Sequence, residues 1–233
     1  MDTDAVIDVI KGSLDLDRNE PLKDVLYDCF RRSVVIGDLP AGTQINEERL
    51  SKALHISRTP IRIALNRLAD EKLVERVPGS GVIVHGISLR DAEEIYEIRK
   101  ALESLATVKA AHNMTDKDFD AMRELLEYGE RKNSEGDVDA VVANFADFSD
   151  FVYRFSRMTR LRDIITSIYV YLRFFRDLSI RRDERRDLAL KEHWDIYLAM
   201  RFGNDEKIVA AVERHLLHNF RYISKIMEGR GIA

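Results

Sequence analysis

Cysteine is nearly absent from this 233-residue sequence, since Cys29 is the only one. A single thiol cannot form a disulfide within the chain, so a hydrophobic core must hold the fold, as is usual in a reducing compartment. No apolar run approaches the roughly 18 residues that span a bilayer, and the acidic start MDTDAVIDVI lacks the positive segment of a signal peptide. We therefore expect a cytoplasmic protein without membrane contact.

An excess of positive charge is also missing, because the formal net charge is −4. This balance excludes the generally basic surface of proteins that coat nucleic acids, so any contact with a polyanion must be local. Proline is scarce and does not occur after Pro78, which favours long helices in the second half of the chain. The 45% hydrophobic content is enough for the cores of one large or two small domains.

The stretch 46–85, NEERLSKALHISRTPIRIALNRLADEKLVERVPGSGVIVH, predicts two short helices joined by a tight turn and followed by a hairpin. Asn46 suits the N-cap of the first helix, and Pro60 suits the first turn of the second, where a missing N–H does no harm. The β-rich segments VERV and VIVH flank a glycine-containing tip. This order is the outline of a winged helix-turn-helix, in which the second helix enters a DNA major groove.

The second helix of this stretch has two unlike faces. Ile61, Leu65 and Leu68 form an apolar stripe, and no acidic residue lies between Ser57 and Asn66. The residues on the other side of the helical wheel are Thr59, Arg62, Ile63, Asn66 and Arg67, with Arg58 at the N-terminal flank. Arginine neutralises phosphate charge and can bind guanine O6 and N7 together. The alternative is that both arginines are an ordinary solvated helix face, but the turn, the proline and the hairpin together favour DNA binding.

Residues 22–84, with the core IGDLPAGTQINEERLSKALHISRTPIRIALNRL, resemble the DNA-binding domain of the GntR family of bacterial transcription regulators. The resemblance implies that the recognition helix contacts double-stranded operator DNA and that a wing glycine approaches the DNA backbone. On these grounds and on the helix face we expect the following DNA-binding residues: Ser57, Arg58, Thr59, Arg62, Asn66 and Gly79.

Two positions depart from the pattern of the family. Ile63 stands where an acidic residue is usual, and Glu48 stands where the fatty-acid-responsive branch has a DNA-contacting arginine. The base preference of the family therefore does not carry over to this chain.

Helical periodicity alone continues after residue 86, so the predicted fold class is mainly α, with an N-terminal winged helix-turn-helix followed by an all-α bundle. We expect an acid-rich N-terminal tail at 1–20 with room for some helix, and a DNA-binding domain at 21–86 that begins with a helix at 22–36. A helical ligand-binding and dimerisation domain follows at 87–233. The helices predicted in the last domain are 89–112, 115–132, 137–157, 160–181, 184–202 and 205–228. Its aromatic residues, which mostly fill a core, are Phe145, Phe148, Phe151, Tyr153, Phe155, Tyr169, Tyr171, Phe174 and Phe175.

Two kinds of polar residue point to a cavity among these aromatics. Arg99 lies between apolar neighbours, so it must pair either with Glu103, four residues on, or with an anionic ligand. His193 and His215 stand about equally far from the turn at 203–205, so two helices that fold back there bring the imidazoles face to face. Facing imidazoles suggest half of a metal site or a pair of ligand donors, although an interior histidine is often only hydrogen-bonded core.

The second half is similar to the FCD effector domain of the FadR-like branch of the same family, over about 88–228. The similarity rests on IYEIRKALESLA and on KEHWDIYLAMRFGNDEKIVAAVERHLLHNF. It implies that Arg99 holds a ligand carboxylate and that His193 and His215 match two metal-binding histidines. The matching aspartate and third histidine are replaced by Phe145 and Ser149. We therefore expect no tightly bound cofactor, with a zinc or nickel ion at His193 and His215 as the alternative.

These features together predict a homodimeric transcription regulator that acts as a repressor and binds a small carboxylate effector in its helical domain. The residues expected to bind the effector are Arg99, Ser149, His193 and His215. One alternative is a DNA-binding protein whose second domain only dimerises. A metal-dependent enzyme is the other, but we find no spacing of nucleophile and base that would give it a reaction. We expect no enzymatic activity.

Overall fold

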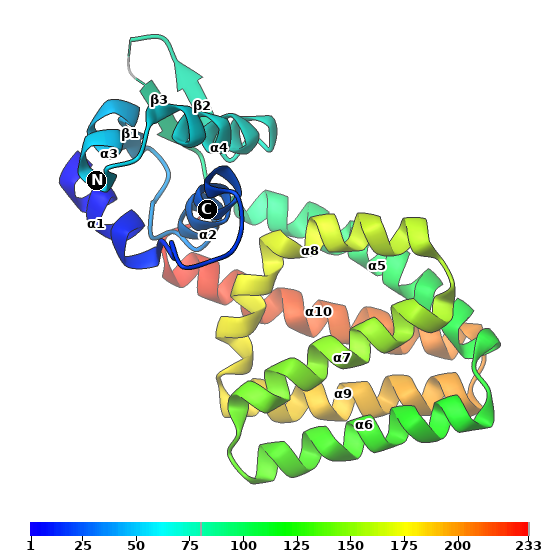
Figure 1. Cartoon of the computed structure of the whole chain (residues 1–233). Coiled ribbons are helices and arrows are strands. Elements are labelled where there is room, and N and C mark those ends of the chain that lie inside the picture. The colour runs from blue at the N-terminus through cyan, green and yellow to red at the C-terminus, as the bar shows by residue number, and fades with distance from the viewer. Residues whose placement is uncertain (80, 233) are drawn as a thin grey trace. The chain divides into compact units, whose positions relative to one another are not determined.

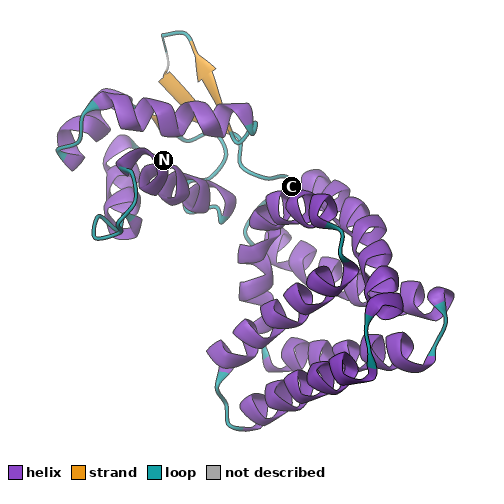
Figure 2. Cartoon of the chain, turned by 45° about the vertical axis from the view of Figure 1, so that its right-hand side comes forward, coloured by secondary structure: helices purple, strands orange, loops and turns teal. Residues whose placement is uncertain are grey.

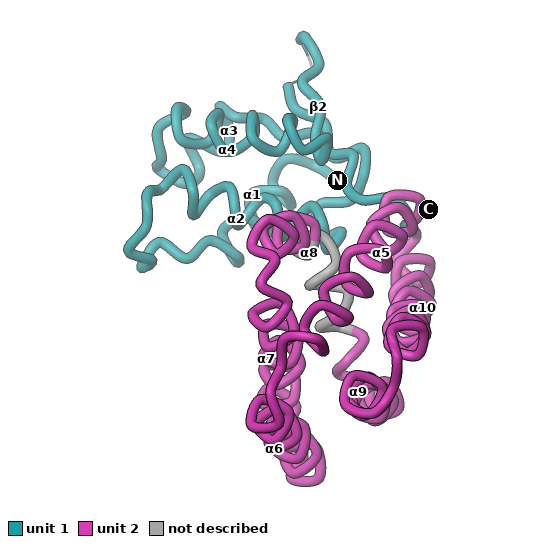
Figure 3. Tube along the Cα trace, turned by 90° about the vertical axis from the view of Figure 1, so that its right-hand side faces the viewer, with its two compact units in different colours: residues 1–88, 232 teal, residues 89–231, 233 magenta. Residues whose placement is uncertain are grey.

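The computed structural model describes residues 1–79 and 81–232, together with the side chains of all of these except 169–178. The chain divides into two compact units, residues 1–88 with 232 and residues 89–231, which Figure 3 shows in different colours. Each unit is described by itself below. The predicted core positions Tyr169, Tyr171, Phe174 and Phe175 fall outside the described side chains.

The first unit combines four helices of the described chain with a small antiparallel sheet (Figure 1). The sheet has three strands in the order β1-β3-β2, so the predicted hairpin of β2 and β3 gains a short third strand. Val74 pairs with Val84 in the hairpin, and Gln44 pairs with Ile83 at the added edge. The elements are α1 (Thr3–Ser13), α2 (Leu22–Val35), β1 (Gln44–Ile45), α3 (Glu47–Leu54), α4 (Arg58–Asp70), β2 (Val74–Val77) and β3 (Gly81–Val84).

Residues 1–20 contain one helix, as a partly helical tail allows. Asp2 caps helix α1 by accepting a hydrogen bond from the backbone of Ala5 at 2.8 Å. Val6 and Ile10 on α1 are fully buried, and the helix packs against α2 and α3. This segment is rich in acidic residues, but its apolar side chains recur at helical spacing and pack against the rest of the unit.

The core of the first unit follows the predicted apolar stripes. Leu50 of α3 and Ile61, Leu65 and Leu68 of α4 have no exposed surface. The side chain of Asn46 accepts a hydrogen bond from the backbone N–H of Arg49 at 3.0 Å, as expected of an N-cap. The pair α3 and α4 is thereby fixed as a helix-turn-helix with one face buried.

The second unit is built of helices (Figure 2). Helix α10 packs against α5 and α9, while α7 packs against α5 and α6. Each helix end lies within two residues of its predicted position, so the predicted fold class is confirmed. The helices are α5 (Leu89–Asn113), α6 (Asp116–Ser134), α7 (Val138–Ser156), α8 (Thr159–Ile180), α9 (Asp183–Phe202) and α10 (Asp205–Gly229).

Capping explains why these boundaries can be located in the sequence. Thr115 and Asp118 form a reciprocal capping box at the start of α6, and Asn204 accepts from the backbone of Lys207 at 3.0 Å at the start of α10. The antiparallel hairpin of α9 and α10 follows directly from the short turn that Asn204 ends. None of the helices in the described part of the chain has the length and apolarity to cross a membrane.

Candidate functional site

The predicted recognition helix presents a continuous exposed face. Arg58, Arg62 and Asn66 follow one another at four-residue spacing along α4, which places them on one side of the helix. Each residue predicted to contact DNA is exposed: Ser57, Arg58, Thr59, Arg62, Asn66 and Gly79. Their contact with DNA stays a prediction, but the arrangement leaves every one of these groups accessible to a duplex.

Arg67 does not belong to this face, although its position on the helical wheel had placed it there. Its guanidinium binds Asp24 of α2 at 2.6 Å and stacks over the ring of Tyr27 at 3.6 Å from the ring centre. The Tyr27 hydroxyl donates to Glu71, and burial raises the pKa of that hydroxyl to about 12. Arg67 therefore fastens α4 to α2 and holds the recognition helix in place.

The wing is braced against the recognition helix by Arg76 of β2. Its Nη1 lies 2.7 Å from Glu47 at the start of α3, and its Nε donates to Oδ1 of Asn66 at 2.6 Å. Gly79 at the wing tip has φ of +79°, a conformation that residues with a Cβ rarely adopt. The same arginine thus joins the wing, the first helix of the motif and the recognition helix.

The second unit encloses a cavity of about 30 Å³ among α5, α7, α8, α9 and α10. Every residue predicted to bind an effector lines it, although the contact with an effector stays a prediction. The lining residues are Arg99, Glu103, Phe145, Ser149, Ile180, Arg185, Ala189, His193, His215 and Asn219.

Arg99 has the internal partner that the sequence allowed. Its Nε lies 2.6 Å from Glu103, and both side chains are largely buried. Burial would lower the pKa of Arg99, but the Glu103 carboxylate and the Tyr96 and Tyr153 hydroxyls raise it above its ordinary value. Arg99 is therefore a permanently charged guanidinium beside the cavity, and its charge is balanced by Glu103.

The two histidines meet as the helical hairpin predicts. The ring centres of His193 and His215 are 4.9 Å apart. Phe148 stacks on His193 at 4.3 Å, and Phe145 meets the same imidazole edge-on at 4.7 Å. The ring of His193 is thus packed against two aromatic rings.

His215 belongs to a buried polar network centred on Glu192. One Glu192 oxygen lies 2.8 Å from Nδ1 of His215 and 3.3 Å from Nη1 of Arg185, while the other accepts from His218. Asn219 bridges the network, since its Oδ1 accepts from Nη2 of Arg185 and its Nδ2 lies 3.0 Å from Nε2 of His215.

Burial acts differently on the ionisable groups of this network. It lowers the pKa of His215, and the hydrogen bond to Glu192 only partly opposes that effect. Burial alone would raise the pKa of Glu192, but His215, Arg185 and His218 outweigh it, so the pKa lies below its ordinary value. The network therefore holds a carboxylate, a guanidinium and a neutral His215 side by side.

The donor set does not fit a tightly held metal ion. Phe145 offers no ligand atom, and the Ser149 hydroxyl donates to the Phe145 backbone carbonyl at 3.2 Å. Both ring nitrogens of His215 face groups of the protein. Across the described side chains, no cluster of three or more His, Cys, Asp or Glu residues is arranged to bind a metal. Divalent ions in proteins generally need three or four such ligands.

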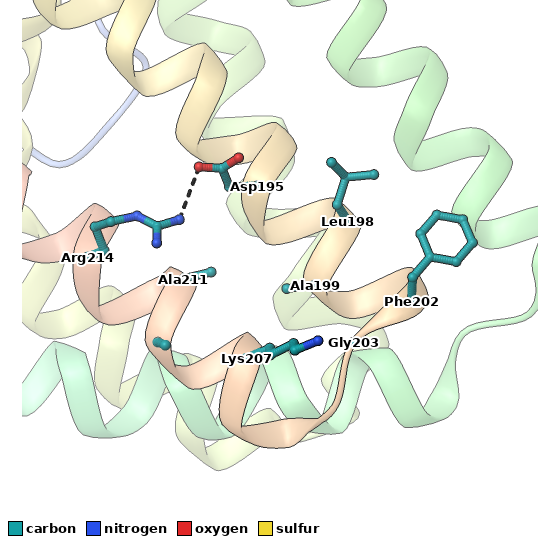
Figure 4. Close-up of a pocket in the computed structure, with 9 residues that line it drawn as sticks. Asp195, Leu198, Ala199, Phe202, Gly203, Lys207, Ala211 and Arg214 are labelled. Carbon is teal, nitrogen blue, oxygen red and sulfur yellow. Dashed lines mark hydrogen bonds and ion pairs between the residues drawn. The ribbon is translucent and has the colours of Figure 1, made fainter.

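A larger hollow of about 420 Å³ lies on the outer side of the hairpin of α9 and α10 (Figure 4). Asp195 of α9 and Arg214 of α10 bridge it with an ion pair of 3.0 Å, while Phe202 is 75% exposed. Its charged groups are hydrated, so an anion there would compete with water at each contact. The smaller cavity is the better candidate because its charged groups are buried.

Sequence reasoning missed Arg185, Glu192 and Asn219. A signal for them exists, since Arg185 precedes Glu192 by seven residues and Asn219 follows His215 by four, spacings that share a helix face. The pairing between Arg185 and Asn219 spans 34 residues, so periodicity alone could not reveal it.

Comparisons with known proteins match both units to described families. Residues 22–84 match the model of the bacterial regulatory proteins of the gntR family, and residues 94–218 match the FCD domain. The uncharacterized HTH-type transcriptional regulator YdhC of Bacillus subtilis is 25% identical over 91% of this chain and 96% of its own length. The repressor RspR of Escherichia coli is 22% identical, covering 86% of this chain and 88% of its own length.

A solved structure adds support for the fold. The E. coli regulator McbR is 28% identical over 72% of this chain and 75% of its own length. Its structure matches 88% of this chain and 98% of that one with a TM-score of 0.61. Because the FCD model alone spans more than half of the sequence, the chain belongs to the GntR family of bacterial DNA-binding transcription regulators and carries an FCD domain.

Proposed function

We propose that the protein is a homodimeric repressor whose winged domains bind a symmetric operator and whose FCD domain binds a small organic acid. Because bacterial operator DNA lies in the cytoplasm, we propose that the protein acts there. Its relative RspR is named a repressor, which favours this sign of regulation. The relatives are named as regulators, so we propose a regulatory rather than an enzymatic role.

The DNA-binding half of the proposal rests on the exposed face of α4. Arg58 and Arg62 are accessible, and the first turn of the helix carries no acidic residue. The cationic end of the helix therefore meets the phosphates without a repelling carboxylate on the same turn. We propose that Ser57, Arg58, Thr59, Arg62 and Asn66 face the major groove and that Gly79 approaches the backbone.

The observation that carries the effector half is the pairing of two buried guanidinium groups, Arg99 and Arg185, on the wall of one cavity. Buried guanidinium groups bind carboxylates strongly because water competes poorly there. A cavity of about 30 Å³ has room for only about two water molecules, so an organic acid enters only if the surrounding side chains move.

The difference in size between the cavity and an organic acid supplies a mechanism for regulation. A ligand that fits only a rearranged cavity binds that arrangement of the helices better and shifts the population toward it. By linkage, the operator then weakens effector binding by the same factor by which the effector weakens operator binding. We propose that effector binding releases the repressor from DNA in this way.

The second candidate is a regulator whose FCD domain only dimerises. The ion pair of Arg99 and Glu103 and the small cavity favour it, because the charges are satisfied without a ligand. Thermal unfolding against a panel of carboxylic acids, followed by operator-release assays with each acid that stabilises the protein, separates the two. We expect at least one acid to do both. Stabilisation by none of them would favour the structural role.

A further inference from the structure

We propose that Arg185 is the cation that receives the anionic effector, in place of a metal ion held by His193 and His215. This inference rests on the effector site proposed above and adds a binding residue to it. Arg185 is fully buried, with no exposed surface, and lies on the wall of the cavity. A fully buried guanidinium requires acceptors for its N–H groups, so the positions of those acceptors show which donor is still open.

The terminal nitrogens of Arg185 are both engaged. Nη1 lies 3.3 Å from Glu192, and Nη2 donates to Asn219. Nε is buried and has no hydrogen-bond partner among the described residues. An unsatisfied charged donor inside a protein is unfavourable, so an acceptor that enters the cavity and bonds to it relieves that cost. The Nε–H group is therefore an open donor of Arg185.

The same contacts show why His215 is not available to a metal ion. Arginine carries donors only, so the Asn219 atom that faces Arg185 must be the amide oxygen. The amide nitrogen then faces Nε2 of His215, which must accept through its lone pair. The ring proton of the neutral imidazole stands on Nδ1 and is donated to Glu192. Arg185 thus fixes Asn219, and Asn219 occupies the lone pair through which His215 could bind a metal.

The charges around Arg185 define the class of ligand. Glu192 is shared among Arg185, His215 and His218, and Glu103 is engaged by Arg99. Arg185 therefore has only part of a carboxylate, so a ligand that brings one further negative charge meets an incompletely balanced guanidinium on the cavity wall. The narrow cavity favours a compact oxyanion, and a short-chain carboxylate meets the Nε–H with one oxygen.

The test uses the full-length protein labelled with ¹⁵N and sodium acetate as the probe, with sodium chloride at equal ionic strength as the reference. The Nε–H resonance of Arg185 is assigned by through-bond spectra and by its loss in Arg185→Lys. We expect this resonance to shift in a saturable way with acetate and not with chloride. Lysine keeps the charge but lacks the Nε–H, so Arg185→Lys should bind acetate at least about tenfold more weakly.

Arg214→Lys is the matched control, because Arg214 lies on α10 but pairs with Asp195 at the surface. It should bind acetate as the wild type does. If Arg185→Lys fails to fold, the response of the wild-type Nε–H resonance to acetate still tests the inference. A resonance that does not respond to acetate, or an unchanged affinity in Arg185→Lys, would overturn the inference. If an acid of the larger panel nevertheless releases the operator, the proposed function stands without Arg185, whereas failure of the whole panel removes the proposed effector site itself.

Discussion

Arg76 in the wing donates its Nε–H to the side-chain oxygen of Asn66 on the recognition helix, at 2.6 Å. This bond determines what Asn66 can offer to a base, because an asparagine that reads adenine needs both its oxygen and its nitrogen. With the oxygen held by Arg76, the exposed amide of Asn66 is left with N–H donors. It suits acceptors such as guanine O6 and N7 or thymine O4.

The first prediction follows from that bond. Arg76→Met removes the donor and frees the Asn66 oxygen, so adenine should become acceptable at the base pair that faces Asn66. The change in discrimination should be about 1–3 kcal/mol, the size of a bidentate base contact. Binding to a library of operator variants measures it. Glu47→Gln is the control, because Glu47 contacts Arg76 without touching Asn66. If Arg76→Met and the wild type prefer the same bases, Arg76 does not restrict base recognition by Asn66.

The second prediction concerns Arg58 and Arg62. Replacing either by alanine should weaken specific operator binding by about 1–3 kcal/mol, since each is an exposed arginine on the face that enters the groove. Fluorescence anisotropy at moderate salt is suitable for the measurement. Arg160→Ala, which removes an exposed arginine from the second unit, should have little effect. Unchanged affinity in both variants of α4 would remove this helix from the recognition role.

Local signals made most of the fold predictable, and long-range pairing accounts for what was missed. Asn46, Thr115 and Asn204 mark helix starts by their own side chains, so the boundaries could be located without tertiary information. Arg67 was misplaced because its partners, Asp24 and Tyr27, lie on another helix. A helical wheel shows the direction of a side chain but not the partner that it contacts on another helix.

The features of the candidate cavity also fall into those that a local pattern predicted and those that depend on long-range contacts. The facing of His193 and His215 followed from symmetry about one turn, which is a local property of a hairpin. The role of Arg185 depends on Asn219 of another helix and on burial, neither of which has a local pattern. The sequence therefore indicated where the site lies but not its most deeply buried charge.

The third prediction is that the protein is a dimer in solution. One winged domain offers few base contacts, and closed two-fold assembly is the common way for such domains to reach useful affinity. Size-exclusion chromatography with light scattering at micromolar concentration should give twice the monomer mass of 26.9 kDa. A monomer whose mass does not change on addition of operator DNA would contradict this prediction.

The fourth prediction tests the place of α1 in the first unit. Ile10 is fully buried, whereas Leu16, just after the helix, is 59% exposed. Ile10→Ala should lower the free energy of unfolding of this unit by about 2–5 kcal/mol, because it leaves a cavity in a packed core. Leu16→Ala should change it by less than about 0.5 kcal/mol. Scanning calorimetry of the full chain compares them, and equal effects would show that residues 1–20 behave as a tail.

The fifth prediction is that protein purified without chelator contains no stoichiometric zinc or nickel. Phe145 cannot ligate, and His215 already uses both ring nitrogens within the protein. Elemental analysis measures the metal content directly. Stoichiometric metal that is lost in His193→Ala would contradict the prediction and would require Asp147 or Asp150 to supply a ligand, although both are exposed.

A gain of metal binding tests the reason behind this prediction. The double change Phe145→Asp and Ser149→His adds a carboxylate and an imidazole beside His193, but Asn219 still donates to the nitrogen of His215 that a metal would need. Adding Asn219→Ala releases that nitrogen, so the triple variant should bind zinc at least about tenfold more tightly than the double variant, the scale on which outer groups change metal affinity. Competition with a chromogenic chelator gives both affinities. Equal affinities would mean that Asn219 does not hold His215 away from a metal, and the predicted lack of a bound ion would then depend on Phe145 and Ser149 alone.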